Sequence, residues 1–188
     1  MNKVLRNEIL PLGDYEAIRP QFRARIVEDK KARRFDVGDR ATVVFENHDT
    51  VLMQIQEMLR TERITREAAI QHEIDTYNEL VPGHNELSAT VLFSVADKDE
   101  FQRFLAALRG VKVAVVVDGV QFLGIFDDRS VDGEHSPAVL YAKFALNDAA
   151  AGKIRKGGYD IAFAVLHPAY DVRAPLPPQT VASLAEDF

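Results

Sequence analysis

Two segments with helical spacing, joined by a short connection, constrain the fold more than any other feature of this sequence. The first segment carries its apolar side chains on one face, at Val51, Leu52, Ile55, Met58 and Leu59. The second carries them at Ile70, Ile74, Tyr77 and Val81, and Pro82-Gly83 ends it. Because the connection is short, we expect the two helices to form an antiparallel hairpin that packs through its apolar faces.

Strand and turn signals occupy much of the remaining chain. Gly38-Asp39 joins predicted strands at 35–37 and 41–45, and Asp118-Gly119 joins predicted strands at 113–117 and 120–126. Further β-rich segments lie at 89–95, 138–146 and 160–166, with a flexible loop expected at 147–158. Since strands joined by tight turns pair antiparallel, the sequence predicts an α+β fold. In this fold, N-terminal helices and the helical hairpin pack on a largely antiparallel β-sheet.

Two successive helical segments are expected near the N-terminus. Asp14 is expected to cap a short helical turn, and Pro20 to lie in the first turn of a longer helix, because proline inside a helix removes a hydrogen bond. The buried side of that helix is predicted to include Phe22, Ile26 and Val27. Its end is a basic run that suits a helix C-terminus: Lys30, Lys31, Arg33 and Arg34.

The later part of the chain adds two more predicted helices. Asp97 is expected to cap one of them, and Thr180 to cap a short one after the proline-containing segment of the tail. We expect one α+β domain over residues 1–188, with a helical half at 1–86, a sheet-rich half at 87–174 and a C-terminal tail at 175–188.

Composition excludes several kinds of chemistry. The chain has no cysteine, so thiol nucleophiles and thiolate metal sites are excluded, and any metal would need histidine and carboxylate ligands. The net charge is −6, but residues 1–40 hold ten basic and seven acidic side chains. This division favours pairing of the basic N-terminal segment with acidic residues elsewhere in the chain. The acidic overall balance argues against nucleic-acid binding. The chain has no apolar run long enough to span a membrane and no secretory signal, so a cytoplasmic protein is expected.

Three side chains of the second helix form a candidate metal site. At 100° per residue, His72, Asp75 and Glu79 fall together opposite the apolar stripe. Further ligands would have to come from His48, Glu57 or His84. The alternative interpretation is an ordinary solvated helix face, because the paired spacing of di-iron bundles is missing.

A second candidate site consists of polar residues that flank the apolar stripes. Glu57 and Arg60, three residues apart, either pair with each other or leave Arg60 to bind an anion or a partner. Glu57 and Glu73 are expected to line one groove between the hairpin and the sheet. The full predicted partner- or ligand-binding set is Gln54, Gln56, Glu57, Arg60, Arg63, Glu73 and Asn78.

Other chemical motifs are weaker. Ser88 and Ser94 lack the context of a nucleophile elbow, and Gly157-Gly158 does not open a helix as a phosphate-binding loop does. His135 and His167 are interpreted as loop and strand-end residues. The catalytic residues, if any, are not identified by the sequence.

The pattern FEN-x-DT-x3-QIQEM-x-R-x-E-x-I at residues 45–64, followed by HEIDTYNELVPG and ELSAT, resembles an uncharacterised bacterial family, domain of unknown function 3501. The resemblance includes the earlier RPQFRARI and KKARR. It places the motif positions at Glu46, Asp49, Thr50, Gln54, Gln56, Glu57, Arg60, Glu73, Tyr77, Asn78, Pro82 and Glu86. His48 departs from the arginine expected in that family.

The resemblance implies genomic company with rubrerythrin-like di-iron proteins and with iron–sulfur proteins similar to heterodisulfide reductase subunits. It therefore suggests a non-enzymatic accessory protein, linked to iron or redox stress, that binds a partner of one of these classes and needs no cofactor. The alternative is a small metalloenzyme with a divalent metal or iron on histidine and carboxylate ligands. The sequence leaves open self-association into a homo-oligomer.

Overall fold

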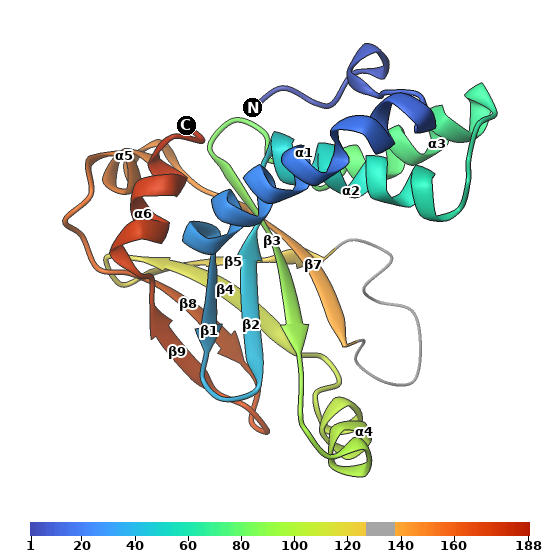
Figure 1. Cartoon of the computed structure of the whole chain (residues 1–188). Coiled ribbons are helices and arrows are strands. Elements are labelled where there is room, and N and C mark those ends of the chain that lie inside the picture. The colour runs from blue at the N-terminus through green and yellow to red at the C-terminus, as the bar shows by residue number, and fades with distance from the viewer. Residues whose placement is uncertain (127–137) are drawn as a thin grey trace.

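The structure, a computed structural model, describes residues 1–126 and 138–188 (Figure 1). Its helices are η1 (Arg6–Glu8, a 3-10 helix), α1 (Leu12–Arg33), α2 (His48–Thr61), α3 (Glu67–Asn78), α4 (Lys98–Ala107), α5 (Asp148–Lys156) and α6 (Pro178–Ala185). Its strands are β1 (Arg34–Val37), β2 (Ala41–Phe45), β3 (Glu86–Phe93), β4 (Lys112–Val117), β5 (Val120–Leu123), β6 (Ile125–Phe126), β7 (Val139–Ala145), β8 (Ile161–Leu166) and β9 (Val172–Pro175). The prediction for His135 lies outside the described residues.

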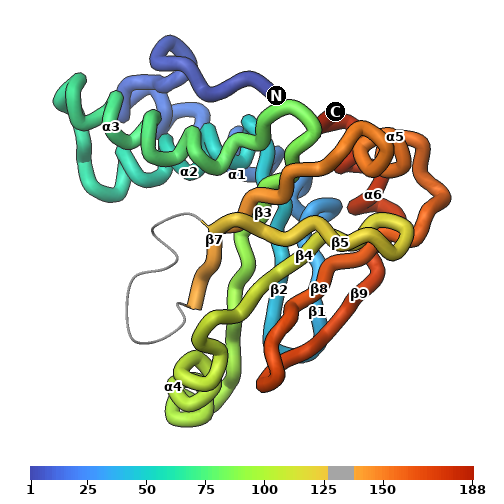
Figure 2. The backbone as a smooth tube through the Cα atoms, turned by 180° about the vertical axis from the view of Figure 1, so that it is seen from behind, coloured from blue at the N-terminus to red at the C-terminus, as the bar shows by residue number. Residues whose placement is uncertain are grey.

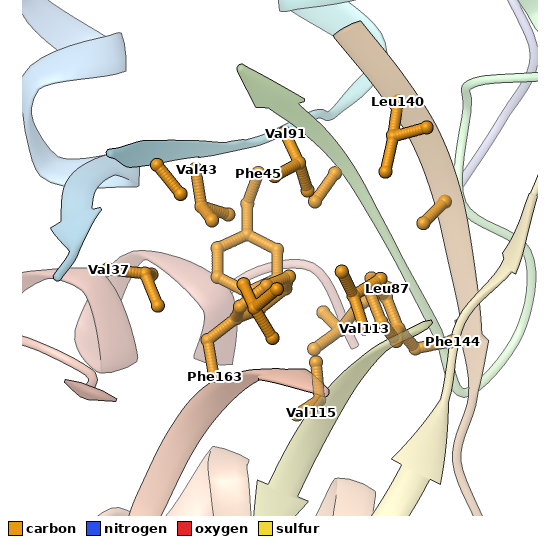
Figure 3. Packing of buried hydrophobic residues seen from close by; sticks show 14 of the residues in the cluster. Val37, Val43, Phe45, Leu87, Val91, Val113, Val115, Leu140, Phe144 and Phe163 are labelled. Atoms are coloured by element: carbon orange, nitrogen blue, oxygen red, sulfur yellow. The ribbon is translucent and has the colours of Figure 1, made fainter. Parts of the chain in front are cut away.

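The strands form two antiparallel sheets that face each other across the main core. The order is β1-β2-β3-β7-β6 in the five-stranded sheet and β5-β4-β8-β9 in the four-stranded sheet. Figure 3 shows Val43 and Phe45 of β2 pointing toward Phe163 of β8 and Val115 of β4. The rings of Phe45 and Phe163 pack edge to face, with their centroids 6.3 Å apart. The α+β class is confirmed, but the strands divide between two sheets instead of one.

Gly124 is the point at which the chain passes from one sheet to the other. The predicted strand 120–126 is broken there, so that β5 pairs with β4 and β6 pairs with β7. A Cβ atom at Gly124 would lie 2.9 Å from both the Phe144 ring and the Val113 side chain. Only glycine therefore fits this corner without displacing core side chains.

The predicted helical hairpin is confirmed as α2 and α3, which lie with α1 in a layer beside the five-stranded sheet (Figure 1). Asn47 caps α2, accepting a hydrogen bond from the Thr50 backbone N–H at 2.9 Å. Val51, Ile55 and Leu59 of α2 are buried in a second core with Ile70 and Ile74 of α3. The N-terminal arm, residues 1–11, contributes Val4 and Ile9 to the same core.

Helix α1 runs without interruption through Pro20, so the predicted break before Pro20 is wrong. Pro20 lies on the exposed side of α1, where water can satisfy the carbonyl that loses its partner. Contacts to α2 at Tyr15 and Arg25 hold the helix on both sides of the proline. Val27, predicted to be buried, is exposed, whereas Ile26 is buried as expected.

Two predictions for the second half of the chain are also wrong. The expected loop at 147–158 contains α5, which Asn147 caps and Gly157 ends, and which buries Ala150, Ala151 and Ile154. Thr180 lies inside α6 instead of capping it, because Pro177 occupies the cap position and Pro178 the first turn. Within the described residues, no helix has the length and apolar character that crossing a membrane requires.

Candidate functional site

Two amide side chains of the predicted binding set hold the N-terminal arm. Gln56 of α2 accepts a hydrogen bond from the Leu10 backbone N–H at 2.6 Å, and its amide group donates to the Leu10 carbonyl. Asn78 of α3 holds Val4 in the same way. It accepts a hydrogen bond from the Val4 backbone N–H at 2.8 Å, and its amide group donates to the Val4 carbonyl at 2.9 Å. Both amides are buried, so leaving either one unpaired would cost stability. Their hydrogen-bonding capacity is used within the chain.

Glu57 and Arg60 both point toward α1, not toward each other. Glu57 accepts hydrogen bonds from the Tyr15 hydroxyl at 2.6 Å and from Arg19 at 2.7 and 2.9 Å. Arg60 donates to Glu16 at 2.6 Å. Neither alternative for this pair holds, because Glu57 does not pair with Arg60 and Arg60 is not left free. The placement of Glu57 in a groove between the hairpin and the sheet is also wrong.

This network changes the ionisation of two of its members. The two hydrogen bonds from Arg19, helped by the one from Tyr15, lower the pKa of Glu57 from 4.5 to about 2. Burial, together with the hydrogen bond to Glu57, raises the pKa of Tyr15 well above its usual value. The carboxylate is thus an ion that stabilises the α1–α2 contact, and it has no proton to give near neutral pH.

His48, at the first position of α2, lies between two carboxylates. Its Nε2 is 3.0 Å from Glu8 of the N-terminal arm and its Nδ1 is 3.1 Å from Asp49. Burial acts to raise the pKa of Asp49, but hydrogen bonds with His48 and Arg25 outweigh it, so that the pKa is lowered overall. His48 therefore also contacts the N-terminal arm.

Glu46 belongs to a buried polar cluster that the sequence analysis did not identify as a unit. The side chain is 2% exposed, and its carboxylate accepts hydrogen bonds from Thr50 at 2.5 Å and from Thr90 at 2.6 Å. Ser88, on the same face of β3 as Thr90, is also buried, and its hydroxyl has no partner among the described residues. The cluster joins the start of α2 to β3. The sequence signal that could have indicated this cluster is the spacing of Glu46 and Thr50 across the predicted start of the helix.

Arg33 is a second buried charge that sequence reasoning missed. It is 2% exposed, donates to the Phe45 carbonyl at 2.9 Å, and pairs with Asp187 near the C-terminus. Burial raises the pKa of Asp187, although Arg33 opposes that effect. In the basic run at the end of α1, only the seven-residue spacing from Ile26 distinguishes Arg33 as a residue on the buried face.

A groove of about 260 Å³ does lie between the hairpin and the five-stranded sheet. It is lined by Glu79, Leu80, Glu86, Ile125, Phe126, Tyr141, Ala142 and Lys143. Glu86 accepts a hydrogen bond from the Gly83 backbone N–H at 2.8 Å and lies 3.2 Å from the Lys143 ammonium. Ile125 of the edge strand β6 is 71% exposed. We call this the hairpin–sheet groove.

Three residues of the predicted binding set keep their polar groups free. Gln54 and Glu73 are half-buried, Arg63 is exposed, and none of the three side chains makes a hydrogen bond or ion pair with another described residue. Arg63 has a backbone φ of 53°, which is uncommon for a residue with a side chain and marks the end of α2.

Gln54 and Glu73 lie on one side of the hairpin. On α2, Gln54 and Gln56 are each one residue, or 100°, from Ile55 in opposite directions. On α3, Glu73 lies 100° from Ile74 on one side, and Asn78, four residues after Ile74, lies 40° from it on the other. Because Gln56 and Asn78 bind the N-terminal arm, Gln54 and Glu73 lie on the side away from it. Figures 1 and 2 show β7 on that side. We name this surface the hairpin underside and define it by Gln54, Met58, Glu73 and Tyr77, all half-buried.

The candidate metal residues lie on the outer face of α3, as expected from their spacing. His72 is exposed, Asp75 accepts a hydrogen bond from Gln71 at 2.8 Å, and Glu79 lies 3.3 Å from the Lys3 ammonium. Within residues 1–126 and 138–188, no three histidine, aspartate or glutamate side chains form a group that could hold a metal ion.

Comparisons with known proteins agree with this description. A crystal structure of a novel protein of unknown function from Burkholderia pseudomallei K96243 has a TM-score of 0.92 and 32% sequence identity to this chain, over 100% of both chains. A comparison with curated proteins gives no match. The profile of a family described as "Protein of unknown function (DUF3501)" matches residues 3–188. The chain therefore belongs to the DUF3501 family.

Proposed function

We propose that this protein is a non-enzymatic accessory protein that binds a partner of the rubrerythrin or iron–sulfur class. The binding surface is the hairpin underside together with the adjoining hairpin–sheet groove. The class of partner follows from the genomic company that the family resemblance implies. The surface follows from the contacts of the hairpin side chains.

The observation that carries the proposal is the division of the polar hairpin residues into two sets. Gln56, Glu57, Arg60 and Asn78 are engaged by α1 and the N-terminal arm. Gln54 and Glu73 share the opposite side, and no described residue pairs with them. Half-buried polar groups without partners are costly in a free protein unless water or a partner satisfies them. Contacts within the chain thus explain the first set, whereas no contact with another described residue explains the second set.

The composition of this surface suits a protein partner. Met58 and Tyr77 on the underside, and Ile125 and Phe126 in the groove, supply apolar contact area. Glu73 supplies a negative charge beside them. Aromatic residues and methionine are enriched in protein interfaces, and charged groups at the rim select the partner. A partner that presents an apolar segment with a basic side chain would complement this surface.

The test is a binding measurement with a purified rubrerythrin-like protein and with a purified iron–sulfur protein similar to a heterodisulfide reductase subunit. Gln54→Ala combined with Glu73→Gln should weaken binding by at least about tenfold, which corresponds to about 1.4 kcal/mol, and should leave thermal stability unchanged. The control pair, Glu62→Gln with His72→Ala, neutralises one carboxylate and truncates one polar side chain at exposed positions, and should bind as the unmodified protein does. Failure of both proteins to bind would overturn the proposal.

The metalloenzyme alternative has less support from the described residues. Asp75 and Glu79 already have partners, and His72 lies beside them without a third free ligand. Elemental analysis of protein purified without a histidine tag distinguishes the two functions. A stoichiometric bound metal that is lost in His72→Ala would favour the enzyme, whereas the accessory function predicts none.

A further inference from the structure

A second groove lies between α5 and α6, at the end of the molecule away from the α2–α3 hairpin (Figure 2). Its volume is about 620 Å³, within the range of small-molecule sites. Ile154, Leu176 and Val181 line its apolar floor. Ala182 and Ala185 of α6 also line the groove, and their small side chains leave space in it. We call it the α5–α6 groove.

One lip of this groove is positively charged. Arg155 and Lys156 are exposed, line the groove, and pair with no other described residue. Lys153, in contrast, is held by Asp118 and lies 5.4 Å from the centroid of the Tyr159 ring. No acidic side chain is among the described residues that line the groove. Arginine and lysine in this setting attract a phosphate or a carboxylate.

The same lip continues into two glycines, where the Gly157 N–H bonds to the Lys153 and Ile154 carbonyls but the space beside the backbone is open. Gly157 and Gly158 have φ values of 67° and 78°, and a Cβ atom on either would meet nothing within 4 Å. The space in front of these glycines is therefore free. Tyr159 follows them and exposes 37% of its surface, which offers an aromatic face beside the charged lip. Nucleotide bases stack on such faces.

Basic residues in the last turn of a helix are common, because they favour the negative end of the helix dipole. That explanation accounts for the charges at the end of α5 but not for the adjoining cavity with its apolar floor and exposed tyrosine. The cavity, the two free cations and the aromatic ring together match a ligand with a planar apolar part and an anionic part.

We infer that the α5–α6 groove binds a phosphorylated small molecule of the mononucleotide class. The phosphate lies against Arg155 and Lys156, in the open space beside Gly157 and Gly158, and the planar base lies against Tyr159 and the apolar floor. This site is separate from the hairpin underside, so it is a ligand site beyond the partner binding proposed above.

Isothermal titration of the full chain with AMP, adenosine and inorganic phosphate tests the inference. AMP should bind saturably, and adenosine and phosphate should each bind at least about tenfold more weakly, because each makes only half of the contacts. Arg155→Glu with Lys156→Glu should weaken AMP binding by at least about tenfold. The charge-matched control, Lys98→Glu with Arg103→Glu on α4, should leave AMP binding unchanged.

Ala182→Trp provides a second variant that does not alter charge. Ala182 is exposed and lines the groove, so the indole should fill the groove without disturbing a core, and AMP binding should be lost with the melting temperature unchanged. Three results would overturn the inference: no saturable binding of AMP, equal affinity in the Arg155/Lys156 variant, or phosphate binding as tightly as AMP. None of these results depends on the partner measurement.

Discussion

The ion pair between α1 and α2 gives a prediction whose size and pH dependence follow from the structure. Replacing Glu57 by glutamine keeps the shape of the side chain but removes the charge that Arg19 contacts at 2.7 and 2.9 Å. A pKa change of one unit corresponds to about 1.4 kcal/mol, so a fall from 4.5 to about 2 represents at most about 3 kcal/mol. Because the Glu57 side chain is 26% exposed, screening by solvent reduces the expected loss for Glu57→Gln to about 2 kcal/mol at pH 7.

The pH dependence has a definite sign. The folded-state pKa of Glu57 is lower than its unfolded value, so its contribution to stability is complete above pH 4.5 and is lost as the pH falls toward about 2. The difference in unfolding free energy between the unmodified protein and Glu57→Gln should therefore shrink between pH 5 and pH 3 by roughly 1 to 2 kcal/mol. Urea denaturation at a series of pH values measures it.

Two controls make this prediction specific. Glu62→Gln removes an exposed carboxylate near the end of the same helix and should change stability by less than about 0.5 kcal/mol at every pH. Arg19→Met should add little to the cost of Glu57→Gln, because both changes remove the same interaction. A Glu57→Gln difference that stays constant from pH 7 to pH 3 would refute the account of this ion pair.

Three further predictions concern the two cores. Arg33→Met should cost about 3 to 5 kcal/mol because it leaves Asp187 buried without its partner, and adding Asp187→Leu should recover much of that loss in chemical denaturation. Gly124→Ala should cost about 1 to 3 kcal/mol because its Cβ would lie 2.9 Å from the Phe144 ring; a neutral effect on melting temperature would contradict the sheet-switching corner. Ile74→Ala should cost about 2 to 5 kcal/mol, and a cost below roughly 1 kcal/mol would mean that the buried face of α3 is assigned wrongly.

Local patterns in the sequence predicted the elements that depend on local physics. The apolar spacing of α2 and α3 predicted their buried faces, because all of these residues except Met58 pack in the second core. The glycine-containing turns at 38–39 and 118–119 predicted both hairpins, since Gly38, Asp118 and Gly119 all adopt positive φ. Asn47 caps α2, as asparagine often does directly before an apolar helical stripe.

The errors arose where distant parts of the chain decide the outcome. The break at Gly124 depends on Phe144 and Val113, which are far from it in sequence, so a continuous β pattern concealed the change of sheet. Pro20 is tolerated inside α1 because contacts to α2 hold both halves of the helix. Likewise, Gln56 and Asn78 were predicted as binding residues because no local pattern shows that their amides hold the N-terminal arm.

Photo-crosslinking from single positions tests the central claim most directly. A photoreactive residue at position 54, on the hairpin underside, is compared with one at position 72, on the outer face of α3, each mixed with the purified rubrerythrin-like or iron–sulfur partner. The account predicts a covalent adduct with the partner from position 54 and none from position 72. An adduct from position 72 alone, or none from either position, would contradict it.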